Sequence, residues 1–157
     1  MSGSTQLNLG CGEFKKPGFI NHDNNPGVQA DVTHNLDVFP YPFPTNHFTL
    51  IEADHVLEHL RYPFKVLAEL HRCMRPGGEL VIRVPHFSRG FTHADHKAGF
   101  DVTFPFYFNP RFKGGYMGTP WQLKSMHLTW FAQLYLKKTV LSPATVAVAS
   151  MVGTGLD

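Results

Sequence analysis

Short apolar runs that end at glycine, proline or polar residues divide the first part of the chain into candidate strands. Such runs, about four to eight residues long and rich in branched or aromatic side chains, are typical of buried strands. The segments that fit are residues 6–9, 19–23, 28–32, 48–53 and 79–85. Phe48–Ala53 carries the strongest pattern and Val28–Val32 a weaker one. We therefore expect five strands before residue 86.

One helix is expected between the last two of these strands. Pro63 suits a first helical position, and apolar side chains then recur with helical spacing up to the stop at residues 75–78. The expected buried stripe is Phe64, Leu67, Leu70, His71 and Met74. Before it, the prolines of residues 37–48 exclude a central strand and predict an extended loop. Strands that alternate with helices or loops predict an α/β fold with a mostly parallel sheet and helices on both faces.

The carboxyl-terminal part follows this pattern less clearly. Trp121–Phe131 has the composition of a strand, whereas Ala144–Val152 is apolar with small residues throughout and predicts a packed surface helix. Ser142 and Pro143 suit the cap and first position of that helix. On this interpretation the sheet has an incomplete carboxyl-terminal hairpin. An edge strand would be left unpaired, and a homo-oligomer or another partner would cover it.

Length and composition predict a single domain over residues 1–157. The chain is 43% hydrophobic and 17% charged, with a formal net charge of +2. Its 157 residues are enough to form a sizeable hydrophobic core. Cys11 and Cys73 are too few for a disulfide framework and fit a reducing cytoplasm. No secretion signal precedes the first strand, and no apolar stretch approaches the ~20 residues of a membrane span. We expect a cytoplasmic protein without a membrane segment.

Glycines and polar residues gather where the expected strands end. In a parallel sheet, ligands bind beyond the carboxyl ends of the strands. The residues at these ends are Gly10, Gly12, Asp23, Asp31, Asp54, His55 and His86. Glycines let a ligand approach the backbone, and a carboxylate after the second strand accepts hydrogen bonds from ribose hydroxyls. The pattern predicts a nucleoside-containing ligand at this edge.

The spacing argues against a dinucleotide. That fingerprint needs a helix start against the pyrophosphate and an acid about 20 residues further on. Here Asp23 follows Gly10 by thirteen positions, and Lys16-Pro17-Gly18 interrupts the segment between them. A full helix does not fit. S-adenosylmethionine has no phosphate and needs places only for adenine, ribose and an amino-acid tail, so it is the favoured cofactor.

Five segments, in this order and spacing, carry a resemblance to a known family. They are LNLGCG, NHDNNP, ADVTHNL, FPYPFPTNHFTLIEADHVLEHL and LHRCMRPGGELVIRVP. Together they resemble the class I S-adenosylmethionine-dependent methyltransferases of the UbiE-like, type 11 kind, over about residues 6–86. The stretch from THADHKAGF to FYFNP resembles small members that have no assigned substrate. The resemblance implies a Rossmann-like sheet, with the first crossover shortened here, and a methyltransferase whose residues 6–86 bind the cofactor while residues 87–157 face the substrate.

The resemblance also implies roles for individual residues. The cofactor-binding set is Gly10, Cys11, Gly12, Asp23, Asp31, Val32, Asp54 and His55. The glycines and the Cys11 backbone would line the methionine and ribose, and Asp23 would bind the ribose hydroxyls. Asp31 and Val32 would flank the adenine. Asp54 and His55 would lie over the reactive end of the cofactor.

Methyl transfer to a hydroxyl needs an aligned acceptor and a base that removes its proton. His86 or His93 is the hypothesised base, because both follow the fifth strand and histidine is the side chain that most often acts as a general base. His55 is the second choice. In the alternative interpretation each imidazole only hydrogen-bonds a loop.

A second motif suggests metal chemistry. His55, Glu58 and His59 spell H-x-x-E-H, the pattern of inverted zinc peptidases. Those enzymes take a further ligand from a downstream glutamate, and no glutamate follows Glu79. Another group of ligand-type side chains, His86, His93, Asp95 and His96, has no recognised metal spacing. We therefore expect solvent-exposed or substrate-facing histidines and assign no metal ligand.

Charge and aromatic residues are concentrated in the second part of the chain. Residues 86–138 hold seven Lys or Arg against two Asp or Glu, interleaved with aromatic side chains. Such a mixture favours either a satellite core with solvated charges or a surface for an anionic, planar or sugar-like partner, including nucleic acid. No acceptor motif of amino-methylating nucleic-acid enzymes is present, so a small-molecule or glycan-type acceptor is preferred. The alternatives are a noncatalytic S-adenosylmethionine-binding module and a nucleic-acid methyltransferase or binder.

Overall fold

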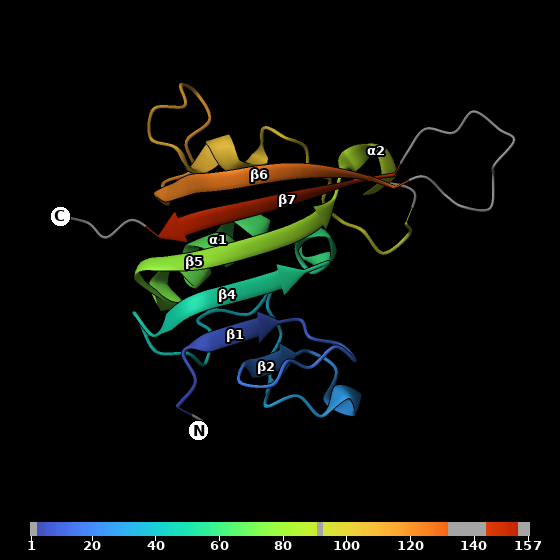
Figure 1. Cartoon of the computed structure of the whole chain (residues 1–157), viewed down its shortest axis with the longest axis vertical. Helices are drawn as coiled ribbons and strands as arrows, with labels where there is room; N and C mark the ends of the chain where they lie inside the picture. Colours follow the sequence, from blue (N-terminus) through green and yellow to red (C-terminus); the bar gives the residue numbers. More distant parts are fainter. Residues whose placement is uncertain (1–2, 91–92, 132–143, 154–157) are drawn as a thin grey trace, which may run out of the picture.

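The computed structural model describes residues 3–90, 93–131 and 144–153 and shows one seven-stranded sheet (Figure 1). The strand order is β3-β2-β1-β4-β5-β7-β6. The first five strands are β1 (Gln6–Leu9), β2 (Ile20–Asp23), β3 (Val32–Thr33), β4 (Phe48–Asp54) and β5 (Met74–Pro85). All neighbours among these five are parallel. The expected α/β class and mostly parallel sheet are confirmed.

The carboxyl-terminal hairpin is complete, contrary to the expectation from sequence. β6 (Trp121–Phe131) is the expected strand, but Ala144–Gly153 forms a strand, β7, and not a helix. β7 lies between β5 and β6 and is antiparallel to both. Small apolar residues are compatible with helix and strand alike, so pairing on both sides decides the outcome. The proposed cap at Ser142 and Pro143 lies outside the described residues.

The connections hold few helical residues. α1 (Pro63–Cys73) joins β4 to β5, as the sequence predicts, and is the only described helix longer than five residues. The shorter helical turns are η1 (Pro26–Val28), η2 (Leu57–His59), α2 (Phe87–Gly90) and η3 (Phe104–Phe108). No helix separates β1 from β2, so the first crossover is shortened as expected. Within the described ranges, no helix is both long and apolar enough to cross a membrane.

The core lies between the sheet and α1, which is behind the sheet in Figure 1. Along β4 and β5, alternate side chains such as Ile51, Leu80 and Ile82 are almost fully buried. On the helix, Val66, Leu67 and Leu70 belong to the same cluster and are fully buried. Burial of a Leu or Ile side chain contributes about 1.5–3 kcal/mol, so this face holds much of the stability.

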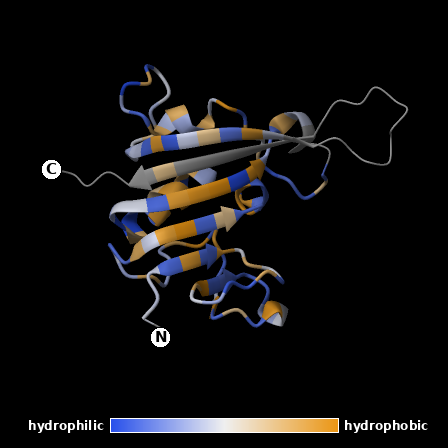
Figure 2. Cartoon of the chain, in the orientation of Figure 1, coloured by the Kyte–Doolittle hydropathy of each residue, from blue (hydrophilic) through white to orange (hydrophobic). Residues whose placement is uncertain are grey.

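The opposite face of the sheet carries charged residues in place of a helical cover. Successive strand residues point to opposite faces, so Glu52, Asp54, Glu79 and Arg83 point away from the core. Ion pairs join Lys16 to Glu52, Arg83 to Asp54 and Lys124 to Glu79. Hydrophilic residues interrupt the hydrophobic ones along β4, β5 and β6 in Figure 2. The sequence predicted helices on both faces of the sheet. In the described residues, α1 covers one face and the other face carries no helix.

Two pairs of hydrogen bonds fix the loops that border the ligand edge. Asn8 Nδ2, buried in β1, donates to the Phe14 carbonyl and to Asn21 Oδ1, both at 3.0 Å, which holds the glycine-rich loop against the sheet. The proline-rich loop is tied to α1, because Arg72 donates to the Phe43 carbonyl at 3.1 Å and Glu69 accepts the Tyr41 N–H at 2.8 Å. Both loops are therefore anchored without helices of their own.

Candidate functional site

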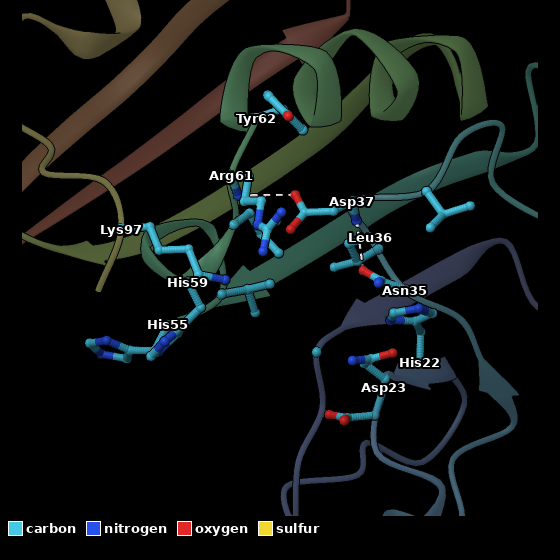
Figure 3. Close-up of a pocket in the computed structure, with 15 residues that line it drawn as sticks. His22, Asp23, Asn35, Leu36, Asp37, His55, His59, Arg61, Tyr62 and Lys97 are labelled. Carbon is cyan, nitrogen blue, oxygen red and sulfur yellow. Dashed lines mark hydrogen bonds between the residues drawn. The ribbon is translucent and has the colours of Figure 1, made fainter. Parts of the chain in front are cut away.

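A pocket of about 720 Å³ opens at the carboxyl ends of the parallel strands (Figure 3). Its walls come from the turn after β1, the end of β2, the segment after β3, η2 with the residues that follow it, and Lys97. In Figure 3, His22, Asp23 and Asn35 lie on one side and His55, His59 and Lys97 on the other. The volume is within the range of small-molecule sites, about 300–1,000 Å³.

The turn after β1 depends on glycine at two positions. Gly10 and Gly12 have φ of +64° and +50°, in the left-handed region that glycine adopts most readily. A Cβ at Gly10 would lie 2.5 Å from Val56 Cγ2, whereas a Cβ at Gly12 would meet nothing within 4 Å. Gly10 therefore allows η2 to approach β1 closely. Gly12 leaves open space beside the turn.

The side chain of Asp23 hydrogen-bonds to this turn. Its carboxylate accepts the Gly12 N–H and the Asn25 N–H, each at 2.8 Å. The side chain lines the pocket at the end of β2. Each carboxylate oxygen has a second lone pair available, so Asp23 can hold the turn and still accept a hydrogen bond from a ligand hydroxyl.

Cys11, within the turn, and His22, which lines the pocket, are both buried. The Cys11 N–H donates to the His22 carbonyl at 2.8 Å, and burial raises the pKa of the Cys11 thiol. His22 is fully buried, and its Nε2 lies 2.9 Å from the His34 carbonyl. Because a carbonyl only accepts, Nε2 carries the proton. Burial lowers the pKa of His22, so the ring is neutral near neutral pH.

Asp31 and Val32 are not among the residues that line the pocket. The expected third strand, Val28–Val32, is wrong: residues 26–28 form η1, and β3 begins only at Val32. Asp31 therefore lies before the strand and not at its carboxyl end. Its carboxylate accepts the Asn21 backbone N–H at 2.7 Å. This contact ties the start of β3 to β2.

The segment after β3 supplies four of the pocket residues that the sequence did not single out. They are Asn35, Leu36, Asp37 and Val38. Asp37 Oδ1 accepts the Arg61 N–H at 3.0 Å, a contact drawn as a dashed line in Figure 3. The useful signal was the motif THNLD directly after the third strand, because residues just beyond a parallel strand reach its ligand edge.

His55 lines the pocket in a strained conformation. Its φ is +54°, which is uncommon for a residue with a side chain, and such strain is concentrated at functional sites. The His55 N–H donates to the Arg83 carbonyl at 2.9 Å, which fixes the backbone. The hydrogen bond from Nδ1 to Glu58 Oε1, at 3.2 Å, raises the pKa of His55. Asp54 does not line the pocket: its carboxylate pairs with Arg83 on the open sheet face.

The structure does not bring His86 and His93 into this pocket. His86 Nδ1 lies 2.9 Å from Ser88 Oγ beyond the end of β5. The His93 ring stacks on His96, with ring centroids 4.6 Å apart. Of the three hypothesised bases, His55 alone borders the pocket.

A second pocket of about 450 Å³ is lined by Pro63 and Ala98, the sequence neighbours of Tyr62 and Lys97 in the first pocket, among other residues. Its lining is largely aromatic and includes Phe64, Phe104 and Tyr107. Other aromatic residues of this region are core: Phe108 and Trp121 are buried. The interpretation as a satellite core is therefore confirmed for these two residues, while the second pocket keeps an aromatic wall.

Comparison with known proteins gives the family context of this geometry. Residues 17–82 match the family model described as a methyltransferase domain. A demethylmenaquinone methyltransferase of Chlamydia trachomatis is 38% identical over 55 residues, which are 35% of this chain and 21% of that protein. A tRNA U34 carboxymethyltransferase of Methylococcus capsulatus is 45% identical over 47 residues, 30% of this chain and 14% of that protein.

A solved structure extends the likeness to nearly the whole chain. The N-methyltransferase NodS of Bradyrhizobium japonicum, in complex with S-adenosyl-L-homocysteine, superposes with a TM-score of 0.68 at 15% identity. The match covers 97% of this chain and 79% of NodS. The resemblance to S-adenosylmethionine-dependent methyltransferases is confirmed. This methyltransferase-like chain covers less than a quarter of the length of either sequence relative.

Proposed function

We propose that the chain binds S-adenosylmethionine in the 720 Å³ pocket and transfers its methyl group to a small-molecule or glycan-type acceptor. The observation that carries the proposal is the carboxylate of Asp23, held by the Gly12 N–H at the mouth of β1 and β2. A carboxylate at this place accepts hydrogen bonds from ribose hydroxyls. The family match over residues 17–82 supports the same cofactor.

The remaining lining divides into two parts that suit the two ends of this cofactor. Gly10 lines the pocket, and the turn that continues through Cys11 and Gly12 gives backbone access for the ribose and the amino-acid tail. At the carboxyl end of β3, Asn35, Leu36 and Asp37 border the pocket and take the place near the adenine that was expected of Asp31 and Val32. Leu36 supplies apolar contact and its neighbours supply polar atoms.

The acceptor enters, in this proposal, from the side of the aromatic second pocket. Aromatic rings give flat apolar contact to planar or sugar-like molecules, and Pro63 and Ala98 of this pocket directly follow Tyr62 and Lys97 of the cofactor pocket in sequence. The burial of Phe108 and Trp121 removes them as stacking surfaces for nucleic acid. Phe106, Phe112 and Tyr116 stay exposed, so the preference for a small-molecule or glycan-type acceptor rests on the aromatic lining of the second pocket.

The base that the sequence suggested stays a proposal, with His55 now the first choice because it borders the pocket. Turnover of the His55→Ala, His86→Ala and His93→Ala variants separates the three. Loss of turnover confined to His55→Ala, with cofactor affinity retained, is expected. Unchanged rates in all three would remove general-base catalysis by these histidines.

Calorimetric titration with S-adenosylmethionine and S-adenosylhomocysteine tests the cofactor site. We expect Asp23→Asn to weaken binding of both by about tenfold or more, because a hydrogen bond to a charged group contributes about 1.5–3 kcal/mol. Asp31→Asn is the matched control: it removes the same charge outside the pocket and should leave affinity within about twofold. Equal affinities in the two variants, or no heat from wild-type protein, would overturn the proposal. Binding without turnover on any acceptor would favour the noncatalytic module.

A further inference from the structure

The side chain of Glu58 is fully buried but only half satisfied. Its Oε1 bonds to His55 Nδ1 at 3.2 Å. Within the part of the chain that the structure describes, Oε2 has no hydrogen-bond partner. A buried carboxylate oxygen without a partner is costly, and such an orphan calls for an explanation, of which an ion is one.

Two imidazoles from distant parts of the sequence meet next to this carboxylate. The Lys97 N–H donates to the Glu58 carbonyl at 2.7 Å, which holds the 93–98 segment against η2. The contact brings His96 to His59, with ring centroids 4.8 Å apart and the planes at 82°. Both residues are half-buried, so water and ions can reach them. The backbone therefore fixes the place where the two rings meet.

Glu58, His59 and His96 each offer one ligand atom, and these three atoms lie within 4.8 Å of one another. Ligands at about 2.0–2.2 Å from a tetrahedral zinc ion are roughly 3.5 Å apart, so small side-chain rotations would close the set. Two imidazoles and one carboxylate are the ligands of many zinc sites. We propose that Glu58, His59 and His96 bind a divalent transition-metal ion, with Zn²⁺ the preferred ion.

This arrangement differs from the zinc-peptidase pattern that the sequence suggested. In H-x-x-E-H enzymes the two histidines of the motif are ligands and the glutamate serves as base. Here His55 is outside the ligand group and pairs with Glu58 Oε1, while the second imidazole comes from His96. His55 instead orients the carboxylate, as partners of metal ligands commonly do. The lack of a glutamate after Glu79 therefore counts against a peptidase but not against this metal site.

The site borders the cofactor pocket, since His59 and Lys97 line that pocket. Three protein ligands leave one tetrahedral position open. In a zinc-bound protein, a water molecule would take that position. If the proposed methyl transfer holds, and this step alone rests on it, the open position can take a hydroxyl oxygen of the acceptor and favour loss of its proton.

Zinc binding to chelator-treated, tag-free protein tests the site. Calorimetry should show one Zn²⁺ per chain, and His59→Ala and His96→Ala should each weaken the affinity by at least about tenfold. Glu58→Gln keeps the shape of the buried side chain and should weaken it similarly. His127→Ala removes an exposed histidine of β6 and is the matched control, with unchanged affinity expected. Cobalt substitution adds a visible spectrum that reports on tetrahedral coordination.

Folding and cofactor affinity are measured on the same variants. Circular dichroism shows whether Glu58→Gln folds. If this variant does not fold, His96→Ala still tests the site, because His96 lies on a loop. The proposal is overturned if wild-type protein binds no Zn²⁺, if both histidine variants bind it as His127→Ala does, or if Mg²⁺ binds more tightly than Zn²⁺. A variant that loses zinc binding but keeps S-adenosylhomocysteine binding shows that the metal site and the cofactor site can fail independently. A variant that loses only S-adenosylhomocysteine binding shows the same.

Discussion

Single residues at the strand ends decide the shape of the ligand edge. Gly10 allows Val56 to approach the turn, and Asp23 holds the amide of Gly12. Asp23 and Gly12 are 11 positions apart in sequence and meet because β1 and β2 are neighbouring strands. The cofactor pocket therefore depends on backbone geometry as much as on side-chain chemistry.

Alanine at the two glycines should have unequal effects. Both substitutions strain a left-handed backbone, at about 1–2 kcal/mol, but only Gly10→Ala adds a Cβ that meets Val56 at 2.5 Å. We expect Gly10→Ala to lower the free energy of unfolding more than Gly12→Ala does and to weaken cofactor binding further. Urea denaturation and calorimetry measure both effects. Equal losses would show that the contact with Val56 is relieved at little cost.

At this scale the sequence was informative where a residue follows a well-marked strand. Gly10 and Asp23 follow β1 and end β2, and both line the pocket. Asp31 was misplaced because β3 is only two residues long and is formed by pairing with β2, which a local pattern does not reveal. Lys97 was missed for another reason: it reaches the pocket through a long-range backbone contact with Glu58.

The two faces of the sheet differ in how they are covered. Along β4 and β5, apolar side chains alternate with Glu52, Glu79 and Arg83, a pattern typical of sheets with one solvated face. A sheet covered on both faces has nearly continuous apolar strands. The alternation thus indicated the open face in advance, although the βα order suggested helices on both sides.

Neighbouring positions of β5 should report this difference. Leu80 is fully buried on the α1 face, whereas Val81 is half-buried on the other. Leu80→Ala should lower the free energy of unfolding by about 2–5 kcal/mol, and Val81→Ala by about 1 kcal/mol or less. Denaturant midpoints of the two variants give the comparison. A loss at Val81 as large as that at Leu80 would mean that something covers the open face in solution.

The hairpin shows where local patterns stop being informative. Residues 144–152 are small and apolar, and their strand conformation follows from pairing with β5 and β6. β7 pairs with β6 on one side, but β6 is the last strand of the sheet, and its other edge has no strand partner among the described residues. The open edge therefore lies at β6, and a homo-oligomer that covers it stays a prediction.

For the whole molecule, the buried ring of His22 links stability to pH. Burial lowers its pKa below the ordinary value of 6.5, so the unfolded chain binds the proton more tightly than the folded one. The contribution of neutral His22 is fully present above about pH 6.5 and is lost as the pH falls toward the folded pKa. Stability should therefore decrease on mild acidification.

Urea denaturation between about pH 7.5 and pH 5 measures this effect. His22→Gln keeps a donor for the His34 carbonyl but does not titrate, so its stability should fall less over that range than that of the wild type. The other histidines are common to both proteins, and the difference between the curves isolates His22. Parallel curves would contradict a lowered pKa.

The glycine turn also contains a natural chemical reporter. Cys11 is buried within it, and Cys73 is buried in α1, where burial raises the thiol pKa to about 11. Alkylating reagents attack thiolates that solvent can reach, so each sulfur becomes modified only when its surroundings open. The rate at Cys11 relative to Cys73 would distinguish local breathing of the turn from unfolding of the whole chain, without any introduced label.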